Sequence, residues 1–141
     1  MNRILFLLIF IFALSSCEKN TTNDVLPEID VDTSVDLNLP SYLDLNTPTG
    51  WAVHTSSKVG VNGILILNTG ATPTYKAFDL ACPNFDCSQQ LIFEGGLTLN
   101  CACDGEKYSI LSGAPQTEGY KYFAREYRVT KNGNILRITN F

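Results

Sequence analysis

The sequence predicts an all-β domain, a small barrel or sandwich, for three reasons. Apolar and polar residues alternate with a period of two in several short segments, which is the pattern of half-buried strands. Gly, Pro, Asn, Thr and Ser interrupt the chain roughly every eight to twelve residues, as turns do in such domains. No segment of the domain sustains apolar residues at helical spacing, and only residues 116–128 come close to it.

The expected strands of the first half follow from alternation and turn residues. Residues 31–39 alternate between apolar and polar side chains, and Pro40 ends this strand or marks it as an edge. After a turn at residues 48–50, residues 51–53 form a short strand. Residues 63–67 are continuously apolar, which suits a central strand that is buried on both faces.

The second half of the domain repeats this pattern. Residues 75–79 form a strand that leads into a cysteine-rich segment, and residues 108–110 and 126–131 alternate again. Asn132-Gly133 is a strong signal for a two-residue hairpin, which returns the chain as residues 134–139.

The start of the chain is typical of an export signal. Arg3 supplies a positive charge, and residues 4–14 form an apolar run that is too short to span a membrane. Leu14-Ser15-Ser16-Cys17 resembles the lipobox of bacterial lipoproteins, in which the signal is cut before the cysteine and the cysteine is acylated. We therefore expect residues 1–16 to be a lipoprotein signal peptide and Cys17 to carry acyl chains such as palmitate, which hold a protein durably on a membrane.

The mature protein then consists of an anchor, a spacer and one domain. Residues 18–30 are polar and acidic and contain Pro27, so we expect residues 17–30 to be the lipid anchor and a flexible tether, and residues 31–141 to be the domain. The formal net charge of −4 argues against nucleic acid as a partner. We expect the bacterial cell envelope as the location, at the outer membrane and facing the periplasm or the surface. The partners there would be the membrane, through the anchor, and an envelope protein or ligand.

Four of the five cysteines lie in two tight clusters. Cys82 and Cys87 form C-x4-C, and Cys101 and Cys103 begin C-x-C-D-G, with Tyr108 a few residues later. This pattern resembles a Rieske iron–sulfur domain, in which the first cluster reads C-x-H-x-x-C and the second reads C-x-C-H-G followed by an aromatic residue. The resemblance implies a Rieske-like topology, with the cysteine clusters on two neighbouring loops of a small subdomain.

The resemblance extends over residues 37–138 and implies a role for each cysteine. In the family, the first cysteine of each cluster binds iron, and the second cysteines join the two loops as a disulfide. Cys82 and Cys101 therefore correspond to iron ligands, and Cys87 and Cys103 correspond to the disulfide.

The residues that complete the iron site of the family are replaced here. Asn84 and Asp104 stand where the two histidine ligands belong, and the only histidine of the chain, His54, precedes the first cysteine by many residues and is expected at the surface. An amide is a poor iron ligand, and a lone carboxylate leaves the iron undercoordinated. Glu106 occupies the position of a hydroxyl residue that tunes the cluster in the family, and its charge disfavours the arrival of an electron.

Three interpretations of the cysteines remain open. In the first, no cofactor is bound and the cysteines form two disulfides, because thiols outside the inner membrane are oxidised. The family then implies Cys87–Cys103, and Cys82–Cys101 bond directly once no iron separates them. In the second, a [2Fe-2S] cluster persists and Asp104, a water or a partner residue completes it. In the third, four thiolates bind zinc, although the spacing matches common zinc knuckles poorly.

We expect a binding or structural module, with an electron carrier that holds an atypically ligated [2Fe-2S] cluster as the alternative. The sequence offers no catalytic constellation, so an enzyme is not expected. The family covers its cluster with a Gly-Pro loop, for which Gly113-Ala114-Pro115 and Gly119-Tyr120 are both candidates. Aromatic and basic residues near the C-terminus fit either a recognition face or ordinary strand packing. They are Tyr120, Lys121, Tyr122, Phe123, Arg125, Tyr127 and Arg128.

Overall fold

The computed structural model describes residues 25–84 and 87–141, and the regular secondary structure of this part of the chain is β-strand apart from one short helix. The expected all-β class is thereby confirmed. The strands of the described residues are β1 (Asp32–Asp36), β2 (Trp51–His54), β3 (Ile64–Asn68), β4 (Tyr75–Asp79), β5 (Leu91–Ile92), β6 (Thr98–Cys101), β7 (Lys107–Ser109), β8 (Glu126–Asn132) and β9 (Ile135–Thr139). A short 3₁₀ helix, η2 (Pro40–Asn46), connects β1 to β2.

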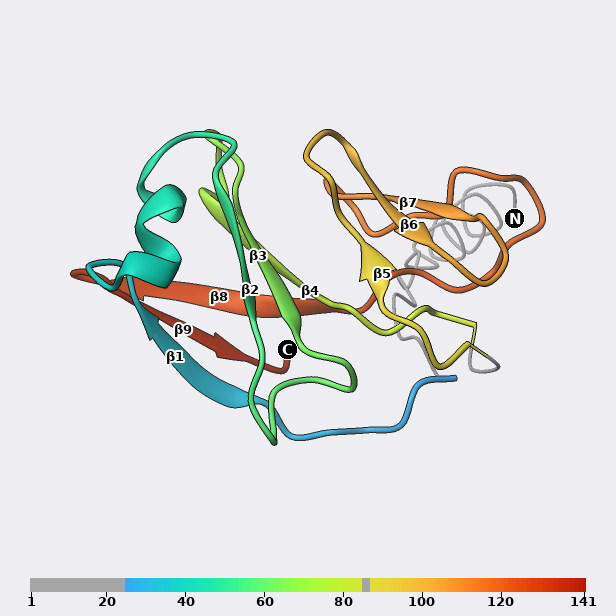
Figure 1. The fold of residues 1–141 in the computed structure, drawn as a ribbon, viewed down its shortest axis with the longest axis horizontal. Coiled ribbons are helices and arrows are strands. Elements are labelled where there is room, and N and C mark those ends of the chain that lie inside the picture. Colours follow the sequence, from blue (N-terminus) through green and yellow to red (C-terminus); the bar gives the residue numbers. More distant parts are fainter. Residues whose placement is uncertain (1–24, 85–86) are drawn as a thin grey trace, which may run out of the picture.

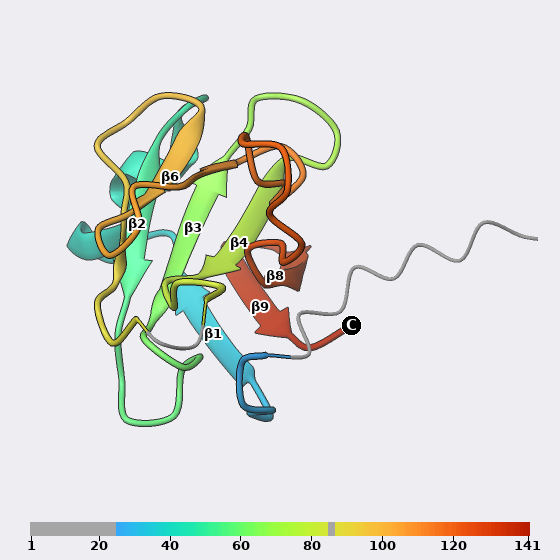
Figure 2. The same ribbon diagram turned by 90° about the vertical axis from the view of Figure 1, so that its right-hand side faces the viewer.

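The strands form two antiparallel sheets. The larger has six strands in the order β1-β9-β8-β4-β3-β2, and the smaller has three in the order β5-β6-β7. Figure 1 shows the small sheet standing to one side of the larger, curled sheet, and Figure 2 shows β2, β3 and β4 side by side from a view turned by 90°. The expected hairpin joins β8 to β9, but its two-residue turn is Gly133-Asn134, one residue later than the sequence predicts, since Asn132 still pairs with Ile135. Gly133 adopts a positive φ of 59°.

β3 is buried on both faces because it lies between two hydrophobic cores. Ile64 and Ile66 point into a core inside the larger sheet, whereas Leu65 and Leu67 point into a second core that also contains the buried cysteines. Side chains alternate between the two faces of a strand, so a strand with a core on each side must be apolar at every position. The continuous apolar run in the sequence has this physical cause.

The first strand is shorter than the sequence predicts. Alternation continues to Leu39, but β1 ends at Asp36 and the chain turns into η2 at Pro40. The proline supplies the fixed φ that suits the first turn of a helix. Leu37 nevertheless stays buried in the core of the larger sheet, and its amide donates to the carbonyl of Asn134 at 2.8 Å.

Residues 25–30, which belong to the expected tether, lie against the domain. Leu26 is buried, and the Arg125 guanidinium donates to the carbonyls of Leu26 and Pro27 at 2.8 and 2.7 Å. The expected signal peptide and Cys17 lie outside the described residues. Among residues 25–84 and 87–141, no helix combines the length and the apolarity that a membrane crossing requires.

A buried carboxylate ties the end of β4 to three other parts of the chain. Asp79 accepts hydrogen bonds from the amides of Val61 and Ala81 at 2.7 Å each, from the Asn62 amide at 3.3 Å and from the Tyr127 hydroxyl at 2.6 Å. These four donors match the four acceptor sites of a carboxylate. The bond to Ala81 fixes the backbone immediately before the first cysteine cluster.

Candidate functional site

Two loops carry the cysteines, and strand pairing brings the loops together. The first loop follows β4, and its two ends are joined by a bridge between Ala81 and Gln90. The second begins at Cys101, which pairs with Leu91 across β5 and β6. It turns tightly through Gly105, whose φ is 75° and whose amide donates to the Cys101 carbonyl at 2.9 Å. The neighbouring cysteine loops expected from the resemblance are therefore present.

The four sulfur atoms gather between these loops. The structure pairs Cys82 with Cys101 and Cys87 with Cys103, with Cα atoms 5.7 and 5.8 Å apart, distances that a disulfide spans without backbone movement. The two pairs also approach each other, because Cys87 Sγ lies 3.8 Å from Cys101 Sγ. Cys82, Cys87 and Cys101 are buried, whereas Cys103 is exposed.

The residues at the histidine positions of the family contact each other. The Asn84 amide donates a hydrogen bond to Asp104 Oδ2, and Asp104 Oδ1 accepts from the Glu106 amide at 3.0 Å. The first of these bonds joins the two loops, and the second stabilises the turn of the second loop. Their side chains bridge the tip of the subdomain, next to the sulfur atoms.

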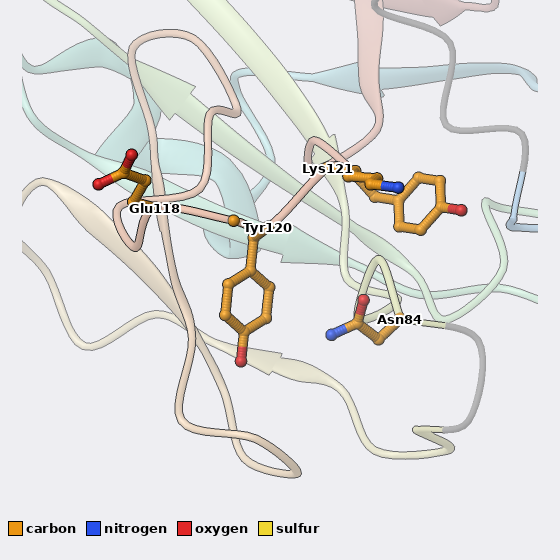
Figure 3. Close-up of a pocket in the computed structure, with 6 residues that line it drawn as sticks. Asn84, Glu118, Tyr120 and Lys121 are labelled. Atoms are coloured by element: carbon orange, nitrogen blue, oxygen red, sulfur yellow. The ribbon is translucent and has the colours of Figure 1, made fainter.

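A cleft of about 430 Å³ opens beside Asn84. Its other walls come from one loop, residues 118–122, which contributes Glu118, Gly119, Tyr120, Lys121 and Tyr122. Figure 3 shows the Tyr120 ring and the Asn84 amide next to each other, with Glu118 and Lys121 on opposite sides. Of the two covering loops considered from sequence, Gly119-Tyr120 is the one that reaches this site.

The other candidate loop has a different place. Gly113 is buried, with φ of 71°, and its amide donates to the Ser109 carbonyl while its carbonyl accepts from Ala124. Pro115 lies in a bridge with Tyr108. A Cβ atom at Gly113 would stand 2.7 Å from the Ala124 carbonyl oxygen, so this position requires glycine. Gly113-Ala114-Pro115 thus extends the small sheet and does not line the cleft.

Glu106 fastens the cleft-lining loop to the second cysteine loop. The residue is 3% exposed, and its Oε1 accepts hydrogen bonds from the amides of Gln116 and Thr117 at 2.7 and 2.9 Å. Burial by itself raises the pKa of Glu106, but hydrogen bonds from Thr117, Gln116 and Lys107 outweigh it, so the pKa lies below its usual value. From sequence, Glu106 was interpreted only as a charge beside a cluster, because nothing in the pattern indicates the loop that it binds.

Tyr108 presents a buried hydroxyl without a hydrogen-bond partner among the described residues. The ring belongs to the same core as Cys82, Cys87 and Cys101. Burial raises the pKa of Tyr108, and the charges of Asp104 and Glu106 raise it further, so the hydroxyl keeps its proton and remains a donor. A buried donor without a partner is uncommon, so this hydroxyl marks a place beside the cysteines where the described residues supply no acceptor.

The residues present do not fit a two-histidine [2Fe-2S] centre. Two sulfur atoms, of Cys82 and Cys101, correspond to the ligands of the first iron, and the Tyr108 hydroxyl has no acceptor among residues 25–84 and 87–141. The second iron, however, would face an amide and a carboxylate that already bind each other. The donor set on that side is hard and incomplete, whereas Rieske centres require two imidazoles there.

His54 has a structural role away from the cysteines. Its Nδ1 lies 2.6 Å from the Tyr42 hydroxyl and its Nε2 lies 3.1 Å from Thr33 Oγ1, so both ring nitrogens are engaged. The ring is half-buried, a correction to the expected surface position, and this burial lowers the pKa of His54. The histidine joins η2 to β1 and β2.

The aromatic and basic residues considered as a recognition face separate into two groups. Tyr120, Lys121 and Tyr122 line the cleft beside Asn84. Tyr127 is buried and donates to Asp79, and Arg125 binds the backbone of residues 26 and 27. Part of this segment is therefore available at the site, whereas Arg125 and Tyr127 stabilise the fold.

No known protein-family model and no curated protein matches the chain. Solved structures do match it. The ferredoxin of carbazole 1,9a-dioxygenase from Nocardioides aromaticivorans IC177 is 15% identical, with a TM-score of 0.48, over 81% of this chain and 100% of the ferredoxin. The quaternary ammonium Rieske monooxygenase CntA, in complex with an inhibitor, is 12% identical, with a TM-score of 0.52. A quaternary ammonium Rieske monooxygenase studied for carnitine oxidation by gut microbiota is 13% identical, with the same TM-score of 0.52.

The likeness to the two monooxygenases covers 79% of this chain and 31% of each of theirs. The chain therefore spans about a third of their length. At this level of identity the likeness concerns the fold alone, and the fold of this chain is Rieske-like.

Proposed function

We propose that this chain is a lipid-anchored protein of the bacterial cell envelope whose Rieske-like domain has lost its iron–sulfur cluster and serves as a binding or structural module. The observation that carries the proposal is the hydrogen bond between Asn84 and Asp104. Groups that ligate iron direct their lone pairs at the metal, whereas these two side chains direct their polar atoms at each other. The bond closes the tip of the subdomain without a cofactor.

The cysteine arrangement supports the same proposal. Cys82–Cys101 and Cys87–Cys103 both join the two loops. These two covalent links hold the loops together, as a bound cluster does in Rieske domains. The export signal and the cysteine at its end favour an oxidising compartment, in which such links persist. Outer-membrane placement follows only from the lipobox and remains part of the proposal.

The cleft beside Asn84 supports a binding role. It presents two tyrosines, a lysine, a glutamate and an amide around one opening. Tyrosines offer both an apolar ring and a hydrogen-bonding hydroxyl, and for this reason they are common in recognition surfaces. The ligand class that matches this lining is a polar molecule or peptide that carries an apolar group.

We expect the full-length protein, purified without oxygen, to contain neither iron nor acid-labile sulfide and to be colourless. Non-reducing peptide mapping of the same sample should recover Cys82 linked to Cys101 and Cys87 linked to Cys103. Two irons and two sulfides per chain, with visible absorbance and free thiols at Cys82 and Cys101, would contradict the cluster-free proposal. Linkage of Cys82 to Cys87 would contradict the cross-loop pairing.

Electron transfer by an atypically ligated [2Fe-2S] cluster is the second candidate. The unpartnered Tyr108 hydroxyl favours it, because a sulfur atom of a cluster is one acceptor that would satisfy such a donor. Cys82 and Cys101 would be the thiolate ligands, with Asn84 and Asp104 facing the other iron. The iron and sulfide analysis decides between the two candidates, since only this one requires both elements.

Replacing Cys17 with serine should move the protein from the membrane fraction to the soluble fraction, because the variant lacks the thiol that is acylated. Fractionation by ultracentrifugation and intact mass measurement check this result. The Ser16→Ala variant serves as the matched control, since it keeps a small residue before the cysteine and should stay in the membrane. Membrane retention of Cys17→Ser, together with a wild-type mass that includes no lipid, would show that the lipobox interpretation is wrong.

A further inference from the structure

We propose that the two disulfides exchange with each other, so that the exposed pair gives external thiols access to the buried pair. This inference rests on the proposed cluster-free state, because iron on Cys82 and Cys101 would leave no second disulfide. It adds an activity, thiol–disulfide exchange, to a domain otherwise interpreted as a binding or structural module.

Exposure makes Cys103 the point of entry. The residues of the inner pair are almost fully buried, with Cys82 0% and Cys101 1% exposed. Cys87 is 7% exposed, whereas Cys103 is exposed to solvent. An external thiolate, from a protein dithiol or a small thiol of the envelope, can therefore reach one sulfur atom of the four. Its attack on Cys103 Sγ forms a mixed disulfide and releases Cys87 as a thiolate.

The released sulfur lies beside the second disulfide. Cys87 Sγ is 3.8 Å from Cys101 Sγ, slightly beyond the separation of about 3–3.5 Å at which reacting atoms are poised. The Sγ atoms of Cys82, Cys87 and Cys101 all lie within 4.8 Å of one another, so Cys87 Sγ is beside the Cys82–Cys101 bond and not in line with it. Once released, the Cys87 side chain must therefore rotate to the side of Cys101 Sγ opposite Cys82 before it attacks. In the outer pair, Cys87 is therefore the sulfur that faces the inner pair, and it is also the leaving group of the first step.

The second step transfers the disulfide inward. The Cys87 thiolate attacks Cys101 Sγ, the Cys87–Cys101 bond forms, the Cys82–Cys101 bond breaks, and Cys82 leaves as a thiolate that takes a proton. A second external thiol attacks the mixed disulfide, releasing Cys103 as a thiol and leaving the two external sulfurs joined. The external dithiol has then lost two electrons, and the protein has gained two thiols and keeps one disulfide.

Two single substitutions in the full-length protein test this route. Cys103→Ser leaves Cys87 free beside Cys82–Cys101, and we expect acid quenching, alkylation and non-reducing mapping to recover Cys87 linked to Cys101, with label on both Cys82 and Cys87. Cys87→Ser is the matched control. This variant also frees one cysteine of the outer pair, but it cannot form the Cys87–Cys101 disulfide. We expect only Cys82–Cys101, with the label confined to Cys103. Cys103→Ser that yields only Cys82–Cys101, with label confined to Cys87, overturns the proposal.

Wild-type protein provides a second measurement that needs no variant. Limiting glutathione, followed by the same quench, should give a one-disulfide species in which Cys87 is linked to Cys101 and the label is on Cys82 and Cys103. A one-disulfide species with only Cys82–Cys101 and label on Cys87 and Cys103 contradicts the exchange while leaving the cluster-free proposal intact. Iron and sulfide in the untreated sample would instead overturn the cluster-free proposal, and the exchange with it.

Discussion

Replacing Asp79 with alanine should destabilise the domain by about 3–5 kcal/mol, since three backbone amides and one hydroxyl lose their acceptor inside the protein. Each buried donor left without a partner costs roughly 1–3 kcal/mol, although such costs are not fully additive. The total free energy of unfolding of a domain is only about 5–15 kcal/mol. The variant is therefore expected to unfold at a much lower urea concentration than the wild type.

Trp51 provides the signal for this measurement. It is the only tryptophan of the chain, and its ring packs edge-on against Phe93 with ring centroids 5.4 Å apart, which joins β2 to the segment after β5. Its fluorescence therefore reports separation of the subdomain from the larger sheet. Tyr127→Phe is the matched variant, since it removes one of the four donors and leaves the carboxylate in place, so a loss of about 1 kcal/mol is expected. Equal urea midpoints for Asp79→Ala and Tyr127→Phe would show that the backbone bonds contribute little.

The sequence predicts the strands well where burial determines the pattern. The strand expected at residues 75–79 coincides with β4, and the expected hairpin joins β8 to β9 with its turn displaced by one residue, to Gly133-Asn134. The order of the strands in the sheet could not be predicted in this way, because β1 pairs with β9 and β4 pairs with β8 across large sequence separations. Alternation shows that a strand is half-buried and carries no information about which strand lies beside it.

Cysteine spacing and the resemblance to Rieske domains predict part of the candidate site. Both indicate two neighbouring loops, and Asn84 and Asp104 were identified as the substitutes for the histidines. The hydrogen bond between them could not be predicted, because it depends on how the two loops are positioned relative to each other in the folded protein. The cleft was missed for a similar reason, since one of its walls is Asn84 and the others come from residues 118–122, which no local pattern connects.

Asp79 and Glu106 show the limit of reading single residues. Asp79 ends an expected strand, where a polar residue is ordinary. Its partners are the adjacent Ala81 and two segments that are distant in sequence, at Val61 and Tyr127. Glu106 lies in a turn beside the cysteines, and its partners Gln116 and Thr117 lie in a loop for which the sequence also allowed helical spacing. In both cases the carboxylate binds mainly backbone amides. Nearly every residue type has such an amide, so no sequence motif identifies these partners.

Glu106→Gln should loosen the loop that lines the cleft and should change how stability depends on pH. Hydrogen bonds to a charged acceptor contribute roughly 1.5–3 kcal/mol, and glutamine retains an oxygen but loses the charge, so a loss of about 1–2 kcal/mol is expected at neutral pH. The amides of Gln116 and Thr117 should exchange their hydrogens faster, whereas amides in β3 should show only the change that follows from the lower global stability.

The pH dependence follows from the lowered pKa of Glu106. In the unfolded chain a glutamate titrates near about 4.3, whereas in the folded protein this carboxyl keeps its charge to lower pH. Its contribution to stability is therefore fully present above that value and is lost as the pH falls through the folded pKa. The difference in unfolding temperature between wild type and Glu106→Gln should be constant above about pH 5 and should shrink below about pH 4. Glu94→Gln, at an exposed position between β5 and β6, is the control and should match the wild type at each pH. A difference in unfolding temperature that stays the same down to pH 3, with unchanged amide hydrogen exchange at Gln116 and Thr117, would mean that the Glu106 carboxylate does not hold this loop.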